Sequence, residues 1–143
     1  MIEINNLSKI AVDKKFFSTV AKKVLSGENR RTETLSLAFV DKAEIKKLNK
    51  KFRKKNKPTD VLSFGEVKNL KYPNHNLGYI GEIVICPEVV KENAKKYKIS
   101  ARQEMLKVFV HGILHLCGYD HEGSEKEAEL MEKKQENYLS KIK

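Results

Sequence analysis

The chain has 143 residues, of which 40% are hydrophobic and 34% are charged, and its formal net charge is +10. These values predict a soluble globular protein with one domain over residues 1–143, and they exclude a membrane-spanning protein because no segment approaches about 20 apolar residues. The excess of Lys and Arg favours an anionic partner such as nucleic acid. Two cysteines and the absence of a secretory signal pattern predict a cytoplasmic protein with reduced thiols.

Three segments of the N-terminal part show clear hydrophobic periodicity. Residues 1–6 alternate as in a short strand, residues 8–26 carry apolar side chains at helical spacing, and residues 32–41 alternate again. Gly27 follows the helical segment and is a typical helix stop. The chain is therefore predicted to begin with a strand, a helix and a second strand.

A basic helix is predicted to follow the second strand. Asp41 and Glu44 have the spacing of a capping box, and Pro58 ends the segment. We expect the buried face of this helix to consist of Ile45, Leu48 and Phe52. Its remaining faces are basic and carry Lys42, Lys46, Lys47, Lys50, Lys51, Arg53, Lys54, Lys55 and Lys57.

Two further strands are predicted at residues 60–67 and 78–86. The polar loop between them contains His75, which we expect to be an exposed loop residue rather than a metal ligand. Pro87 suits the first turn of a helix that runs to about Lys98.

The C-terminal part is predicted to be helical. Ser100 and Gln103 form a capping box before a helix with apolar residues around nearly its whole circumference, so that helix is expected to be central and buried. Ser124 and Glu127 have the spacing to cap a last helix. The predicted order, βαβαββααα, indicates an α/β or α+β fold with one mixed sheet covered by helices.

The segment HGILHLCGYDH, residues 111–121, has the ligand spacing of a zincin-like protease of the metzincin kind. His111 and His115 share one face of the predicted buried helix, one turn apart. Gly118 suits a turn that brings His121 round as a third ligand. Three imidazoles leave one tetrahedral position of a zinc ion open, so the spacing predicts a catalytic type of metal site.

Gly112 stands where the protease pattern has the Glu that takes a proton from water. Because a general base contributes about 10²–10⁴-fold to a rate, its absence disfavours a simple peptidase. Phosphodiester cleavage depends less on such a base, since a metal polarises the phosphoryl oxygen and RNA brings its own 2′-hydroxyl. Cys117 is expected to pack in the core, and Asp120 to orient a ligand or to cap the turn.

The basic segment at residues 42–57 has the charge needed to hold a polyanion, although a solvated lysine-rich helix face is the plainer interpretation. Arg53 differs from its lysine neighbours because a guanidinium can bind a phosphate through two parallel hydrogen bonds. Charge alone does not decide between these two uses.

The motif HGILHLCGYDH, with FRKKNKPTDVLSF and GEIVICPEVV upstream, resembles the YbeY family of bacterial rRNA maturation factors. The resemblance covers the chain from about Leu48 to Met131. It implies a single-strand-specific, metal-dependent endoribonuclease, a hydrolase of phosphodiester bonds, that acts in 16S rRNA 3′-end maturation and ribosome quality control. Its implied partners are single-stranded RNA, ribosomal RNA and the ribosome, with no membrane.

The resemblance also implies a fold and a site. The fold is a mixed, mostly parallel four-stranded sheet packed with about five helices, in which the metal helix is buried. The site holds one divalent metal ion, Zn²⁺ ahead of Ni²⁺, and the family's important arginine falls on Arg53. The implied metal ligands are His111, His115 and His121. In one departure, Gln135 replaces the usual Glu of the last helix, and we expect this change to affect packing more than chemistry.

Two alternatives remain open at the level of the sequence. One is a zinc metallopeptidase that lacks the usual Glu base. The other is a non-enzymatic ribosome-assembly factor with a structural metal, which would need a fourth ligand such as Cys117 or His75. The sequence also leaves open the physiological metal, the nucleophile, any general base in place of the missing Glu, the RNA cleavage site and the oligomeric state.

Overall fold

In the computed structural model, which describes residues 2–65, 78–119 and 123–142, four strands form one sheet in the order β1-β2-β4-β3. The strand β1 pairs in parallel with β2, β2 pairs in parallel with β4, and β3 pairs antiparallel with β4. This confirms the predicted mixed, mostly parallel sheet. The strands are β1 (Ile2–Asn6), β2 (Thr34–Phe39), β3 (Val61–Gly65) and β4 (Tyr79–Ile85).

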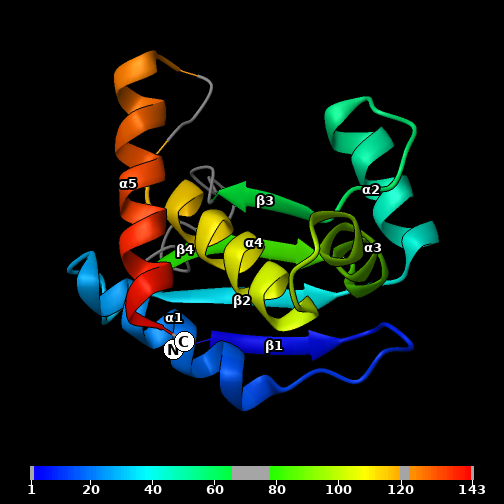
Figure 1. Ribbon diagram of the computed structural model, residues 1–143, viewed down its shortest axis with the longest axis horizontal. Helices are drawn as coiled ribbons and strands as arrows, with labels where there is room; N and C mark the ends of the chain where they lie inside the picture. The colour runs from blue at the N-terminus through cyan, green and yellow to red at the C-terminus, as the bar shows by residue number, and fades with distance from the viewer. Residues whose placement is uncertain (1, 66–77, 120–122, 143) are drawn as a thin grey trace.

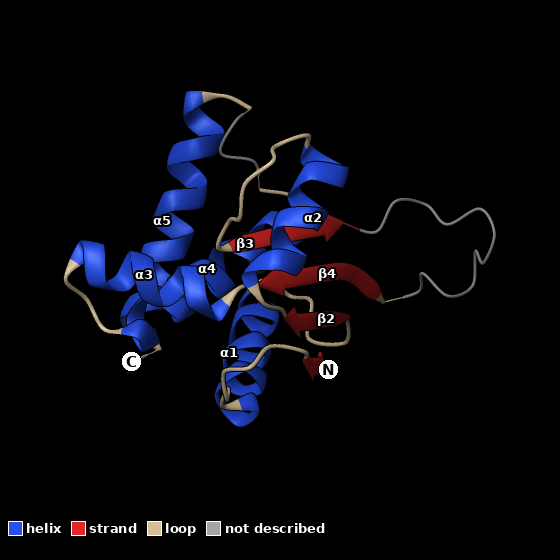
Figure 2. Cartoon of the chain, turned by 90° about the vertical axis from the view of Figure 1, so that its right-hand side faces the viewer, coloured by secondary structure: helices blue, strands red, loops and turns tan. Residues whose placement is uncertain are grey.

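The described residues form five helices, and the predicted order βαβαββααα is confirmed. Figures 1 and 2 show α4 and α5 together on one side of the sheet, with α1 below them and α2 standing at the end of the sheet near β3. None of the helices in the described ranges is long and apolar enough to cross a membrane. The helices are α1 (Lys14–Gly27), α2 (Lys42–Arg53), α3 (Pro87–Tyr97), α4 (Ala101–Leu116) and α5 (Glu125–Lys141).

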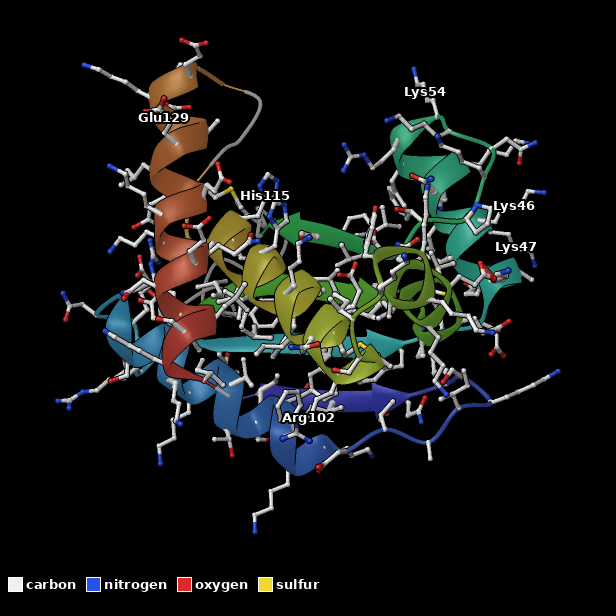
Figure 3. All side chains as sticks on the ribbon, in the orientation of Figure 1. Lys46, Lys47, Lys54, Arg102, His115 and Glu129 are labelled. Carbon is white, nitrogen blue, oxygen red and sulfur yellow. The ribbon has the colours of Figure 1, made fainter. Side chains whose placement is uncertain are left out.

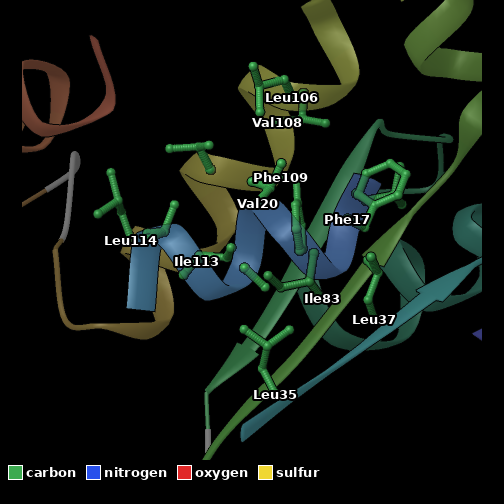
Figure 4. Packing of buried hydrophobic residues seen from close by; sticks show 14 of the residues in the cluster. Phe17, Val20, Leu35, Leu37, Ile83, Leu106, Val108, Phe109, Ile113 and Leu114 are labelled. Atoms are coloured by element: carbon green, nitrogen blue, oxygen red, sulfur yellow. The ribbon is translucent and has the colours of Figure 1, made fainter. Parts of the chain in front are cut away.

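Each face of the sheet packs in its own hydrophobic cluster. Along β4, Ile83 faces the main cluster and contributes to it with Phe17 of α1 and Phe109 of α4. Val84 points to the opposite face, where it packs with Ile45 of α2. Figure 4 shows the main cluster between α1, α4 and the sheet. Because α4 is buried on several sides, the prediction of a central helix is confirmed.

The beginning and end of α4 are well defined. The Ser100 hydroxyl accepts a hydrogen bond from the Gln103 amide at 3.0 Å, and the Gln103 side chain accepts one from the Ser100 amide at 3.0 Å. This is the predicted capping box, which satisfies backbone donors that the helix itself leaves unpaired. Two residues beyond the helix, Gly118 has a φ of +103°, a left-handed conformation that glycine adopts without strain.

The first helix begins later than predicted. Its N-cap is Asp13, whose carboxylate accepts a hydrogen bond from the Phe16 amide at 3.1 Å. Upstream, the Asn6 side chain accepts from the Ser8 amide at 3.0 Å and donates to the Ile10 carbonyl at 2.8 Å. These local side-chain bonds hold the backbone in a turn that competes with helix formation.

The second helix differs from prediction in two details. Asp41 does not cap it through its side chain; the carboxylate instead accepts a hydrogen bond from the Lys9 amide at 3.1 Å. Phe52 is 55% exposed, and its ring packs edge-on against Phe64 at 5.1 Å. The buried position is taken by Asn49, which donates from Nδ2 to the Lys57 carbonyl at 2.8 Å.

Candidate metal centre

Two of the predicted metal ligands lie on the last two turns of α4, one helical turn apart. His111 is half-buried and His115 is exposed. This end of α4 lies against β3 and beside α5, and Figure 3 shows where His115 projects from it. The third predicted ligand, His121, lies outside the described residues, as do Asp120 and His75.

The protonation of the His115 ring follows from its contact with the backbone. Nδ1 of His115 lies 3.1 Å from the carbonyl oxygen of Tyr119, four residues further along the chain. A carbonyl oxygen only accepts hydrogen bonds, so the neutral ring carries its proton on Nδ1. The lone pair is then on Nε2, and a neutral imidazole binds a metal ion through the nitrogen that carries the lone pair.

The His111 ring is oriented by α5. Its Nδ1 lies 2.9 Å from Oε1 of Gln135, across 24 residues of sequence. With the amide oxygen as acceptor, the His111 proton also lies on Nδ1 and the lone pair on Nε2. Gln135 was expected to affect packing more than chemistry, but its amide oxygen contacts a candidate ligand directly. Orienting contacts of this kind set the tautomer and the ring position of metal-binding histidines.

Gly112 packs α4 tightly against the sheet. A Cβ atom placed on Gly112 would lie 3.2 Å from Cδ1 of Ile83 on β4 and 3.3 Å from Oγ of Ser63 on β3. The residue is buried, and the two neighbouring strands meet the helix at this point. The glycine therefore has a packing role, which the comparison with protease motifs did not reveal.

A buried carboxylate fixes the turn that follows the histidines. Glu28, whose side chain is 7% exposed, accepts a hydrogen bond from the Tyr119 hydroxyl at 2.6 Å and another from the Tyr138 hydroxyl. Lys134 lies 3.5 Å from the same carboxylate. Because the carbonyl of Tyr119 also contacts His115, this network links the end of α1 and α5 to a candidate ligand.

The environment of the Glu28 network shifts the pKa values of its members. Burial works to raise the pKa of Glu28, but the hydrogen bonds from Tyr119 and Tyr138 and the charge of Lys134 outweigh it, so the pKa lies below its ordinary value of 4.5. The hydrogen bond to Glu28, with burial, raises the pKa of Tyr119 to about 12. The carboxylate is thus ionised and both phenols are neutral near pH 7.

Replacing Glu28 by Gln is expected to lower Tm by several degrees at pH 7, because charge-assisted hydrogen bonds are lost. A depressed pKa stabilises the fold above the unfolded-state value, and that contribution disappears as the pH falls below 4.5 through the folded-state value. The Tm difference between wild type and Glu28→Gln should therefore shrink in this acid range. Thermal unfolding from pH 3 to pH 7 measures it, and a difference that does not change with pH would contradict the assignment.

The structure places the other predicted site residues as follows. Arg53 is exposed at the last position of α2. Lys46, Lys47 and Lys54 extend outward from the same helix and its C-cap (Figure 3). Cys117 is half-buried against the main cluster, as predicted, and burial raises the pKa of its thiol to about 11.

His111 and His115 are suitable partners for a metal ion. In each ring Nδ1 donates a hydrogen bond to an oxygen, so that Nε2 carries the lone pair that can bind a metal ion. Among residues 2–65, 78–119 and 123–142, no group of three or more His, Cys, Asp or Glu side chains is arranged to hold a metal. His121, the third ligand that the sequence predicts, lies outside these ranges.

Comparison with known proteins identifies relatives over the whole fold. The family model described as endoribonuclease YbeY matches residues 3–143. A relative of that name from Bdellovibrio bacteriovorus is 43% identical over 87% of this chain and 83% of its own length, and one from Sulfurihydrogenibium is 37% identical over 92% and 84%. A solution structure from Thermotoga maritima superposes with a TM-score of 0.70 at 34% identity and covers 99% of this chain and 89% of that one.

Proposed function

The chain belongs to the endoribonuclease YbeY family, and from this premise we propose that residues 1–143 form a single metal-dependent domain that cuts single-stranded RNA. The proposed setting is the cytoplasm, where the enzyme would act on ribosomal RNA in 16S 3′-end maturation and ribosome quality control. The observation that carries the metal dependence is the pair of α4 histidines, each held through Nδ1. The family membership favours this activity over a peptidase or a structural-metal protein.

The residues proposed to hold the ion are His111, His115 and His121. When bound, a divalent ion such as Zn²⁺, or Ni²⁺ in its place, supplies polarisation of a phosphoryl oxygen and lowers the pKa of water. The Tyr119 carbonyl and the Gln135 amide keep the two α4 imidazoles in the metal-binding tautomer. Gly112 contributes no base, so the nucleophile, whether water or the substrate's own 2′-hydroxyl, must lose its proton to another group.

Substrate binding is assigned to the basic surface of α2 and its C-cap. Its exposed lysines would attract the RNA backbone, and Arg53 would bind a phosphate near the cut. Attraction of this kind is electrostatic, so the affinity for RNA should fall steeply with rising salt concentration. The role of Arg53 in phosphate binding is a prediction from the sequence.

Removal of the metal tests the proposed activity directly. Protein loaded with Zn²⁺ should cut a single-stranded RNA and leave the same sequence intact in a duplex, and protein treated with a chelator should lose the cleavage and regain it when Zn²⁺ returns. The chemistry of the product ends distinguishes water from the 2′-hydroxyl as nucleophile. Cleavage that survives complete metal removal, in a preparation shown to be free of other nucleases, would refute the proposal.

Replacing Gln135 by Ala is expected to weaken metal binding by about 10–100-fold, because it removes the acceptor that orients His111. Replacement by Glu keeps an acceptor there and should retain or improve the affinity. Competition with a chelator measures the affinity, and the ring ¹⁵N shifts of His111 report its tautomer in the metal-free protein. Glu136→Ala, at an exposed neighbouring position, is the control. Unchanged affinity and ring shifts in Gln135→Ala would show that the contact does not orient the ligand.

A further inference from the structure

A small cleft of about 240 Å³ opens beside His111, and its walls come from four elements or their ends. Three of its residues, Glu104, Lys107 and His111, lie on one face of α4, at spacings of three and four residues. The remaining polar lining is Asp60 just before β3, Tyr97 at the end of α3 and Gln135 on α5. The cleft is therefore continuous with the candidate metal centre through His111 and Gln135.

Glu104 is an unusual residue for the inner wall of this cleft. It is 2% exposed, and its Oε1 has no hydrogen-bond partner among the described residues. Burial raises the pKa of this carboxyl by more than the charge of Lys107 lowers it. A buried acceptor without a donor is destabilising, and such groups are rare in folded proteins. The position calls for a hydrogen-bond donor that the described part of the chain does not supply.

The outer part of the cleft has different chemistry. Nζ of Lys107 lies 5.6 Å from the centre of the Tyr97 ring, and Tyr97 is 53% exposed. An exposed aromatic ring next to a lysine is an arrangement that stacks a nucleobase and attracts a phosphate. The carboxyl groups of Glu104 and Asp60 disfavour a bare anion deeper in the cleft. The lining thus suits a ligand with an anionic group, a flat ring and hydroxyl donors.

We propose that this cleft is a ribonucleotide subsite in which Glu104 accepts a hydrogen bond from a ribose hydroxyl and Tyr97 stacks on the base. The inference rests on the proposed RNA substrate. His111 comes seven positions after Glu104, about 10.5 Å along the helix, so the sugar bound by Glu104 belongs to a nucleotide next to the scissile phosphate and not to the reacting group.

Such a subsite lets the protein bind RNA more tightly than DNA, independently of the chemistry of cleavage. The 2′-hydroxyl is the group by which a protein distinguishes the two at a given position. A hydrogen bond to it contributes about 0.5–1.5 kcal/mol, or more if the acceptor is charged, which corresponds to a preference of about 2- to 13-fold. Glu104 would supply this preference at a position that does not touch the reacting phosphate.

The test uses metal-free protein and two probes, AMP and 2′-deoxy-AMP, whose binding is followed by NMR titration. Wild type should bind AMP about 2- to 13-fold more tightly, with amide shifts at Tyr97, Glu104 and Lys107. Glu104→Ala should bind both nucleotides equally, and Glu104→Gln should keep part of the preference through its amide oxygen. Tyr97→Ala should weaken both nucleotides without changing their ratio. Glu125→Ala, an exposed acid in the first turn of α5, serves as the control.

Three outcomes would overturn the proposal: equal affinity of wild type for the two nucleotides, an unchanged preference in Glu104→Ala, or shifts that lie outside the cleft. Because the titration involves neither metal nor cleavage, its result is independent of the proposed activity. AMP binding in the cleft without RNA cleavage by the metal-loaded protein would refute the activity alone. RNA cleavage by a protein whose Glu104 has no effect on sugar preference would refute the subsite alone.

Discussion

His115→Ala is expected to abolish RNA cleavage and to weaken Zn²⁺ binding by more than about 100-fold, which exceeds the effect of losing an orienting contact. The reason is the proposed role of Nε2 as a metal donor, supported by the contact of Nδ1 with the Tyr119 carbonyl. The fold should survive, because His115 is exposed and surface substitutions usually change stability by less than about 0.5 kcal/mol. Metal affinity, cleavage rate and Tm are measured on the same preparation.

Two companion variants separate the possible roles of the metal. His75→Ala should keep both metal and cleavage, and loss of the metal in this variant would instead favour a closed structural site with a fourth protein ligand. Arg53→Ala should keep the metal and lose most of the cleavage, since its proposed partner is the phosphate. If His115→Ala lost the metal and still cut RNA at the wild-type rate, the proposed mechanism would be wrong.

The periodic signals that the sequence carries are local, and the structure confirms the elements that depend on them. The apolar circumference of α4, its capping box at Ser100 and the alternation in β2 each predict an element within a few residues. The predicted elements differ from the structure where a polar side chain forms a hydrogen bond with backbone that is distant in sequence, or where such a bond competes with helix formation. Asp41 accepts from Lys9, 32 residues away, and so does not cap α2.

The contacts that organise the site join residues that are far apart in sequence, so no local sequence pattern predicted these contacts. Tyr119 and Glu28 are 91 residues apart, and Tyr138 and Glu28 are 110 apart. One signal was available: Glu104 precedes His111 by two helical turns and therefore shares its face. A carboxylate on the same stripe as a candidate ligand was visible in the sequence, but its burial was not.

Gly112→Glu is expected to destabilise the protein by more than about 3 kcal/mol and to create no peptidase, although it restores the protease motif. Overpacking costs about 1–3 kcal/mol, and a buried carboxyl without a partner adds a desolvation cost. The Cβ position faces Ile83 and Ser63 at 3.2 and 3.3 Å, so the added side chain would enter the contact between α4 and the sheet.

Gly112→Ala separates the effect of space from that of charge. The added methyl group is tight, but alanine is favoured over glycine in a helix by about 1 kcal/mol, so the net loss of stability should stay below about 2 kcal/mol. Urea unfolding of wild type and both variants measures the free energies, and an unstructured peptide assays the new activity. If Gly112→Glu were as stable as wild type and hydrolysed peptides, the only effect of Gly112 would be the absence of the general base. The expected result, severe destabilisation by Glu and mild destabilisation by Ala, would show that close helix–sheet packing excludes the protease base from this position.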